Sequence, residues 1–108
     1  MSLRNSSQSI LIPVAQIGEL APDDYVGLID DTAVECLKAR FAAEGQHTPI
    51  WVRQNGNAAK MRFSVVCGRH RLRAAKALGW NEIQIEVRAD MHSTRADLVA
   101  LQVIENLD

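Results

Sequence analysis

Basic side chains cluster immediately after an apolar run in the middle of the chain. Arg69, His70 and Arg71 follow Gly68, which itself follows a β-branched and apolar segment over residues 63–67. This composition predicts a strand that passes through the glycine into a short helix rich in Ala and Leu. The start of a helix presents unpaired N–H groups and a partial positive charge, so three basic residues there indicate an anion-binding site, best suited to phosphate.

The basic residues of this predicted helix fall on two sides. Arg71 shares its side with apolar residues one and two turns later, which places it at the pocket end of a buried stripe. Arg69, Arg73 and Lys76 share another side, which we expect to face solvent or a partner. Residues 60–76 contain six Lys or Arg and no acidic residue, whereas the whole chain has a formal net charge of −1. One concentrated basic site in a nearly neutral domain suits a small polyanion better than a long duplex.

Length and composition indicate one globular domain. The chain has 108 residues, of which 47% are hydrophobic and 23% charged. It contains no signal peptide and no apolar run near the roughly 20 residues of a membrane span, so we expect a cytoplasmic protein without a membrane partner. Cys36 and Cys67 are too few for a disulfide framework or a metal site, and their apolar neighbours predict buried thiols. Residues 1–9 are polar and are expected to form a flexible segment before a domain over residues 10–108.

Short strands are predicted at four places. They cover residues 10–14, 49–53, 62–67 and 83–87. Pro13 places the first of these strands at an edge or a strand end. The turn signal at residues 55–57 (Asn-Gly-Asn) predicts that the second and third strands pair as an antiparallel hairpin. Residues 17–31 are punctuated by Gly and Pro and are predicted to be mostly loop.

Two further helices are predicted from capping boxes. Thr32-x-x-Glu35 begins a helix that ends near residue 44, and Thr94-x-x-Asp97 begins the last helix. The residues expected to face inward are Val34, Leu37 and Phe41 in the first of these helices, and Ala100, Val103, Ile104 and Leu107 in the last. Together with the strands, this order of elements predicts a compact α+β domain.

Three separated segments of the chain resemble sequence boxes of one protein family. They are residues 45–53 (GQHTPIWVR), 68–75 (GRHRLRAA) and 104–107 (IENL). In this order and spacing they resemble the N-terminal domain of ParB-type partition proteins, also described as a ParB-like nuclease domain. That domain has the ParB/sulfiredoxin-like fold, which also includes sulfiredoxins and free-serine kinases. The resemblance covers residues 10–108 and implies a small mixed sheet with three main helices.

This resemblance implies a nucleotide site, because ParB proteins bind a nucleoside triphosphate, CTP, together with Mg²⁺. The implied site residues are Gly68, Arg69, His70 and Arg71 for the phosphates, Gly45, Thr48 and Pro49 for the base and sugar, and Glu105 and Asn106 for the phosphates and their Mg²⁺. In ParB proteins, nucleotide binding switches a self-associating clamp that loads on DNA. The implied partners are therefore a nucleotide, a second copy of the chain, and DNA of the nucleoid or of a plasmid. A separate helix-turn-helix domain reads the DNA site in those proteins, and the sequence up to Asp108 contains none.

Four positions differ from the usual ParB pattern. Arg69 stands where Glu is usual, His70 where Arg is usual, and Thr48 where Gln is usual. Asp108 stands where Gln-Arg often follows. A cation remains at each phosphate-binding position, so phosphate binding is expected, whereas the preferred base and hydrolysis stay open. We expect at most slow hydrolysis of the triphosphate. Nuclease activity is not expected, because the sequence lacks an acidic cluster that would hold metal ions against a phosphodiester.

Two other functions are compatible with the same residues. The pattern Gly-x-His-Arg also resembles sulfiredoxins and free-serine kinases, which would make the chain an ATP-dependent phosphotransferase with Glu105 as general base. Cys67 lies two residues before the position of the sulfiredoxin cysteine, on the predicted strand, which favours a buried thiol over a nucleophile. Alternatively, Arg69, Arg73 and Lys76 contact DNA phosphates or another partner in a module that binds no nucleotide.

Overall fold

The computed structural model describes residues 9–106, which form a five-stranded sheet, three α-helices and two short 3₁₀ helices. In chain order the elements are β1 (Ile10–Pro13), η2 (Val14–Gln16), β2 (Ile17–Glu19), η3 (Pro22–Asp24), α1 (Asp31–Glu44), β3 (Ile50–Gln54), β4 (Phe63–Cys67), α2 (Arg69–Ala77), β5 (Glu82–Ala89) and α3 (Arg95–Asn106). The expected α+β class, with a small mixed sheet and three main helices, is confirmed. Within residues 9–106 no helix combines the length and the apolar character that a membrane crossing requires.

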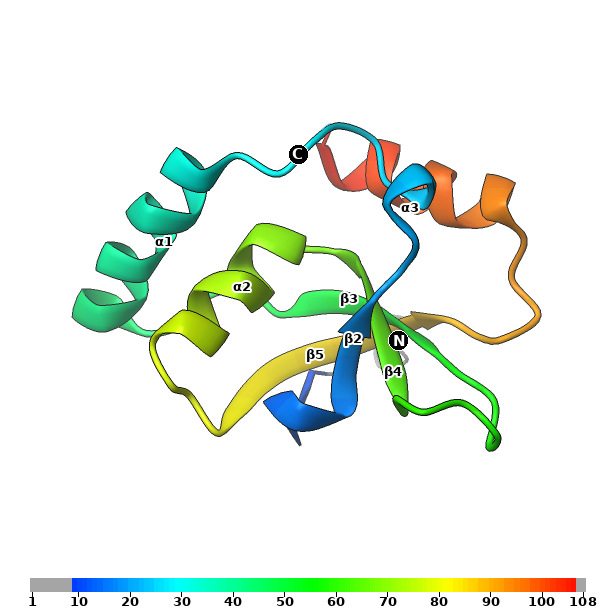
Figure 1. The fold of residues 1–108 in the computed structure, drawn as a ribbon, viewed down its shortest axis with the longest axis horizontal. Helices are drawn as coiled ribbons and strands as arrows, with labels where there is room; N and C mark the ends of the chain where they lie inside the picture. The colour runs from blue at the N-terminus through cyan, green and yellow to red at the C-terminus, as the bar shows by residue number, and fades with distance from the viewer. Residues whose placement is uncertain (1–8, 107–108) are drawn as a thin grey trace, which may run out of the picture.

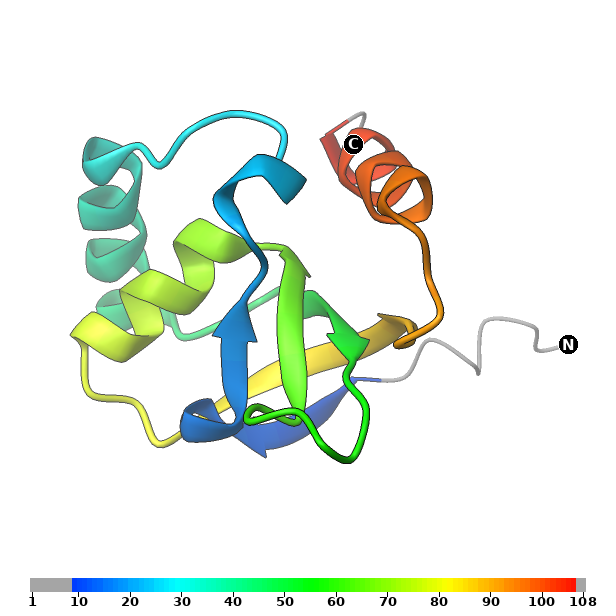
Figure 2. The same ribbon diagram turned by 45° about the vertical axis from the view of Figure 1, so that its right-hand side comes forward.

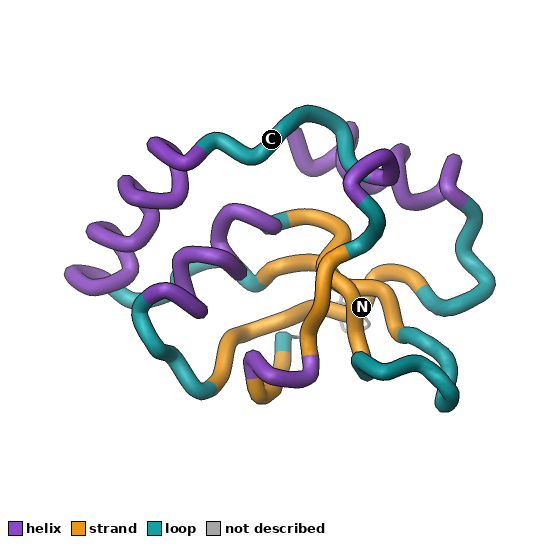
Figure 3. The backbone as a smooth tube through the Cα atoms, in the orientation of Figure 1, coloured by secondary structure: helices purple, strands orange, loops and turns teal. Residues whose placement is uncertain are grey.

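The sheet is mixed, and its strands lie in the order β1-β5-β3-β4-β2. β3 and β4 form the predicted antiparallel hairpin, β5 pairs with β3 in parallel, and β1 forms one edge antiparallel to β5. β2 forms the other edge and pairs in parallel with β4. β4 therefore lies between two strands, and they hold the strand end from which α2 departs (Figures 1 and 3).

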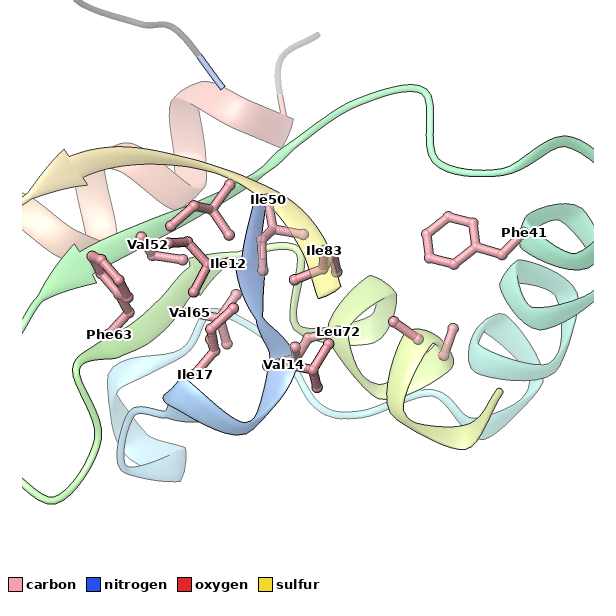
Figure 4. Packing of buried hydrophobic residues seen from close by; sticks show 13 residues of the cluster. Ile12, Val14, Ile17, Phe41, Ile50, Val52, Phe63, Val65, Leu72 and Ile83 are labelled. Atoms are coloured by element: carbon pink, nitrogen blue, oxygen red, sulfur yellow. The ribbon is translucent and has the colours of Figure 1, made fainter. Parts of the chain in front are cut away.

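α1 and α2 lie on one side of the sheet, and the main hydrophobic core lies between α2 and the strands. Leu72 of α2 is completely buried in one cluster with Ile50 and Val65 of the central strands (Figure 4). Burying an aliphatic side chain of this size stabilises a fold by about 2 kcal/mol. α1 joins the core through Phe41, whose ring stacks on Trp80 with centroids 4.9 Å apart. The inward face predicted for α1 is confirmed.

α3 lies on the other side of the sheet, beside β4 (Figure 2). Val65 and Val66 are successive residues of β4 and so point to opposite faces, yet they are 0% and 1% exposed. Val66 belongs to a second buried cluster with Cys67, Leu20 and Leu98 of α3. All five residues of β4 are buried and four of them are apolar, because helices cover both faces of the strand.

The segment between η3 and α1 is fastened to α3 by Gln102. This side chain is only 6% exposed; it donates from Nε2 to the Asp24 carbonyl at 2.8 Å and accepts the Val26 amide at 2.7 Å. Arg95, in the first turn of α3, donates to the Asp23 carbonyl and lies 3.3 Å from the Asp24 carboxylate. From there the chain arches to the start of α1, so it spans the distance between α3 and α1 (Figures 1 and 2).

The expectations for residues 17–19 and for Cys36 are wrong. Ile17–Glu19 lie in the segment predicted as loop but form β2, because β4 offers an edge to which three residues can pair. Cys36 was expected to be buried but is exposed, since α1 packs on the domain through one face only and Cys36 lies outside it. Cys67 is buried, as predicted.

The helix caps agree with the sequence in one case and differ in the other. The capping box of α3 is confirmed, because Thr94 Oγ1 accepts the Asp97 amide and the Asp97 carboxylate accepts the Thr94 amide. The N-cap of α1, however, is Asp30 and not Thr32, and its carboxylate accepts two amides of the first turn. The amide of Asp30 donates to His70 of α2 at 3.0 Å, so a tertiary contact holds the residue that caps the helix.

The apolar stripe predicted for α3 is wrong. Leu98 and Gln102 are buried, whereas Val103 and Ile104 are 46% and 51% exposed. The last residue of the predicted stripe, Leu107, lies outside the described residues. The inward face of α3 therefore contains a buried polar residue, Gln102, because its side chain forms hydrogen bonds to the segment before α1.

Tyr25 ties β4 to the segment that precedes α1. Its hydroxyl donates to the Val65 carbonyl at 2.7 Å and accepts the Leu20 amide at 2.8 Å. Burial raises the pKa of Tyr25 from 10 to about 12, although the hydrogen bond from Leu20 opposes this shift. The neutral phenol is therefore part of the packed structure.

We expect the ultraviolet absorbance of the phenolate to titrate with a midpoint near pH 12. Tyr25 is the only tyrosine of the chain, so the signal reports this residue alone. Because its pKa is raised on folding from 10 to about 12, the stability that the phenol contributes is complete below pH 10 and is lost between pH 10 and about 12. A midpoint near pH 10 in the folded protein would contradict this burial.

Candidate functional site

The predicted turn from strand to helix is present at the end of β4. β4 ends at Cys67, α2 begins at Arg69, and Gly68 between them has φ 102° and ψ 27°, a left-handed conformation that favours glycine. A Cβ atom on Gly68 would lie 2.6 Å from Cγ2 of Ile50, so a larger residue would have to displace the buried Ile50 side chain. No side chain caps this helix start. The first amides of α2 therefore point to a place where a ligand can accept their hydrogen bonds.

Arg71 occupies the centre of the site. Its Nη1 donates to the carbonyls of Thr48 and Pro49 at 3.1 and 3.3 Å, and its Nη2 lies 3.4 Å from the Glu105 carboxylate. The side chain is 17% exposed. Burial lowers the pKa of Arg71, and the Glu105 carboxylate opposes that shift. Arg71 therefore faces the protein and not bulk water, and it joins the start of α2, the segment before β3 and the end of α3.

Arg69 and His70 also contact neighbouring segments. The Arg69 guanidinium lies 4.0 Å from the centre of the Tyr25 ring and donates to the Gly27 carbonyl at 3.2 Å. Nε2 of His70 accepts the Asp30 amide, so the neutral ring carries its proton on Nδ1. The first turn of α2 thus holds the segment that leads into α1 and lines the site at the same time.

The side of α2 that carries Arg69, Arg73 and Lys76 was expected to face solvent or a partner. Its cations instead contact acceptors within the domain. Arg73 forms two hydrogen bonds to the Glu19 carboxylate, at 2.8 and 2.9 Å. The hydrogen bond from Arg73 lowers the pKa of Glu19. Lys76 donates to the Ile17 carbonyl at 3.3 Å. These two cations fasten the edge strand β2 to α2, and Arg69 fastens the Gly27 segment.

A cleft of about 580 Å³ opens at this place, between α1, the start of α2, the segment before β3 and the end of α3. Its volume is in the range of small-molecule sites. Eight of the predicted site residues line it: Gly45, Thr48, Pro49, Gly68, Arg69, His70, Arg71 and Glu105. The side chain of the ninth, Asn106, lies outside what the structure describes. The tertiary structure therefore brings together residues from three separated segments.

Gln46 positions the segment before β3. Its Nε2 donates to the carbonyls of Thr48 and Gln84, both at 3.0 Å, and its Oε1 accepts the Gln84 amide at 2.8 Å. The side-chain amide thereby pairs with β5 as a strand residue would. Gln46 was not predicted as a site residue, yet it fixes the carbonyl to which Arg71 donates.

The cleft is also lined by residues that the sequence did not indicate as site residues. Leu37, Arg40 and Phe41 of α1 line it, as does Gln102 of α3. Leu37, Arg40 and Phe41 are spaced at i, i+3 and i+4, so they share one face of α1. This spacing by itself predicts core packing and does not indicate a binding site. One face of α1 contacts the core and the cleft together, and sequence periodicity does not separate the two roles.

Glu105 is the only carboxylate among the described residues that line the cleft. Its side chain is 35% exposed and is paired with Arg71. Across residues 9–106, no three His, Cys, Asp or Glu side chains gather into a set that would hold a metal ion. A divalent cation in this cleft would therefore need oxygen atoms of a ligand in addition to Glu105.

Cys67 is a buried thiol at the floor of the cleft. Burial raises its pKa from 9 to about 12, and the negative charge of Glu105 adds to the shift, although Arg71 and Arg88 oppose it. The thiolate is the reactive form, so this residue lacks the property that a nucleophilic cysteine requires. The structure favours the buried-thiol interpretation of Cys67.

We expect a disulfide reagent such as DTNB to modify one thiol of the native protein rapidly at pH 8. Cys36 is exposed, whereas the pKa of Cys67, about 12, makes its thiolate fraction about a thousandfold smaller than that of a thiol with pKa 9. Cys36→Ser is expected to abolish the rapid phase, and Cys67→Ser is expected to leave it intact. After denaturation, both thiols of the unsubstituted protein are expected to react. Rapid modification of native Cys36→Ser would show that Cys67 is accessible and ionised.

The family model of the ParB N-terminal domain matches residues 2–107 of the chain. Among curated proteins, the probable chromosome-partitioning proteins ParB of two Neisseria meningitidis strains, of serogroups A and B, are 32% identical over 105 residues. The match covers 95% of this chain and 34% of each relative. The chain therefore spans about a third of the length of these relatives.

Solved structures agree with this match. The C-terminally truncated chromosome-partitioning protein ParB from Caulobacter crescentus, complexed with CTP-gamma-S, superposes with a TM-score of 0.78 at 25% identity, over 93% of this chain and 53% of that one. Sulfiredoxin from Arabidopsis thaliana has a TM-score of 0.63 at 21% identity, over 84% of this chain and 97% of that one, which is a likeness of fold. The family model, the relatives and the shared architecture lead to one conclusion: the chain belongs to the ParB N-terminal domain family.

Proposed function

We propose that this domain binds a nucleoside triphosphate of the CTP type and acts as a nucleotide-dependent switch in a partition or other DNA-regulating protein. The observation that carries the proposal is the start of α2, where Gly68, the uncapped amides and Arg71 open into the 580 Å³ cleft. The Caulobacter ParB that shares this fold was solved with CTP-gamma-S, which supports a triphosphate ligand. In this proposal the phosphates lie on the first turn of α2, and the sugar and base lie beside Gly45, Thr48 and Pro49.

Mg²⁺ would enter this site with the triphosphate. Glu105 supplies one carboxylate at the end of α3, and Mg²⁺ commonly takes few protein oxygens beside phosphate oxygens and water. When bound, the ion neutralises part of the phosphate charge. We propose that Glu105 and Asn106 hold it, and that Glu105 exchanges its contact with Arg71 for the metal.

The partners proposed for the whole protein are DNA and a second copy of the chain. The matched relatives are chromosome-partitioning proteins, which supports an action on DNA in the cytoplasm, with the DNA site read by another part of the protein. Self-association is supported by apolar side chains on α3 and on the segment fastened to it. Val26, Leu28, Val103 and Ile104 are between 46% and 90% exposed.

The two rival functions receive less support. A phosphotransferase would need Glu105 both as general base and beside the Mg²⁺ of its ATP, because no other carboxylate among the described residues lines the cleft. A module that contacts DNA through Arg69, Arg73 and Lys76 would need these cations to be available. Each of them has an acceptor within the domain, at 3.3 Å or less.

Binding of a triphosphate with Mg²⁺ is expected to raise the thermal unfolding temperature. A ligand at 100 times its Kd stabilises the folded state by about 2.7 kcal/mol, which for a domain of this size corresponds to a shift on the order of 10 °C. The measurement is a thermal melt with CTP, GTP, UTP and ATP, each with Mg²⁺, against the nucleosides as controls. If no triphosphate shifts the melt, the proposed function is wrong.

Arg71→Ala is expected to weaken triphosphate binding at least tenfold, because hydrogen bonds to charged groups contribute about 1.5–3 kcal/mol each. Calorimetric titration of the nucleotide that gives the largest shift checks this. Arg73→Ala is the matched control, since it removes the same charge from the same helix outside the cleft. Arg71→Lys keeps the charge and tests whether a loss is due to misfolding. Equal weakening by the Arg71 and Arg73 variants would indicate a general charge effect and contradict a phosphate site at Arg71.

A further inference from the structure

Arg40 is a cation of the cleft that the domain itself does not use. It is an exposed residue of α1 that lines the cleft, and within residues 9–106 no acceptor pairs with its guanidinium. The two other arginines of the cleft are engaged: Arg71 with two carbonyls and Glu105, and Arg69 with the Gly27 carbonyl. A long side chain with a charged, unpaired end in a small-molecule cleft is suited to contact a ligand.

Arg40 lies in the third turn of α1, away from the end of this helix that contacts the start of α2. The amide of Asp30, the N-cap of α1, donates to His70 in the first turn of α2, so the N-terminal ends of the two helices meet. Arg40 follows ten residues after Asp30, which is about 15 Å along a helix that rises 1.5 Å per residue. A nucleotide whose phosphates lie on the first turn of α2 would therefore extend its base towards Arg40.

The surface around Arg40 is suited to a flat ring. Leu37 and Phe41 lie beside it on the same face of α1, and both line the cleft. Phe41 is held in place by its stacking on Trp80, with an angle of 13° between the rings. Apolar side chains flanking one donor group are the usual composition of a site that binds a heterocycle and fixes its orientation.

We infer that Arg40 reads the edge of the nucleobase, an inference that rests on the proposed nucleotide function. The guanidinium only donates hydrogen bonds, from a fixed planar fork, so it pairs best with two adjacent acceptors. Cytosine presents O2 beside N3, and guanine presents O6 beside N7. In adenine an amino group stands next to N1 and N7, and in uracil N3–H separates the two carbonyls. Arg40 therefore favours a cytosine or guanine nucleotide over adenine and uracil nucleotides.

The experiment separates base recognition from phosphate binding with inorganic tripolyphosphate, which has neither base nor sugar. Calorimetric titrations with Mg²⁺ and CTP, GTP, ATP, UTP or tripolyphosphate are made on the wild type, Arg40→Ala, Arg40→Lys and Lys38→Ala. Lys38 is the matched control, because it is a cation of α1 that pairs with Glu35 and does not line the cleft. Arg40→Lys keeps the charge but lacks the fork.

We expect the wild type to prefer CTP or GTP, and both Arg40 variants to bind that nucleotide about tenfold or more weakly. Binding of tripolyphosphate and of the disfavoured nucleotides is expected to change by less than about twofold, and Lys38→Ala is expected to behave as the wild type. An equal loss for tripolyphosphate would place Arg40 on the phosphates and overturn the inference, as would unchanged base preference in Arg40→Ala. If tripolyphosphate binds the wild type and all four nucleotides bind equally, only the inference fails. If no triphosphate binds, the proposed function fails with it.

Discussion

The contacts of the largely buried Arg71 guanidinium are the interactions on which the cleft depends. A charge that is only 17% exposed destabilises a fold unless acceptors surround it, and here the acceptors come from two other parts of the chain. The carbonyls of Thr48 and Pro49 come from the segment before β3, and the carboxylate of Glu105 comes from α3. Because one side chain requires all of these groups, the three segments that line the cleft are held at fixed positions.

The place of Arg71 is in turn determined by the end of β4. This strand is buried on both faces, by α2 on one side and α3 on the other, so its end cannot shift without disturbing both clusters. Gly68 gives the left-handed turn and the close approach to Ile50 that direct α2 away from the sheet. The first turn of α2 therefore combines uncapped amides, the positive end of the helix dipole and basic side chains. This combination is the physical basis of an anion site.

The same contacts connect the cleft with the parts of the domain that surround it. Glu105 neutralises Arg71 and belongs to α3, so an anionic ligand that approached Arg71 would compete with α3 for the same guanidinium. α3 is also tied to the segment before α1 through Gln102, and that segment contacts Arg69. A ligand in the cleft would thus act on contacts that hold two helices, as the proposed switch requires.

Local sequence determined the hairpin of β3 and β4, the turn at Gly68 with its basic first turn of helix, and the capping box of α3, because these signals depend on neighbours within a few residues. The predicted cleft residues outside that turn followed from the family resemblance. Only the tertiary structure decided that Ile17–Glu19 form a strand, that Gln102 is buried, and that Arg73 pairs with Glu19. These outcomes depend on segments that meet across 40 to 80 residues of chain. Periodicity within one helix shows that a face is apolar or basic, but whether that face meets the core, the cleft or another loop is decided by the elements that pack against it.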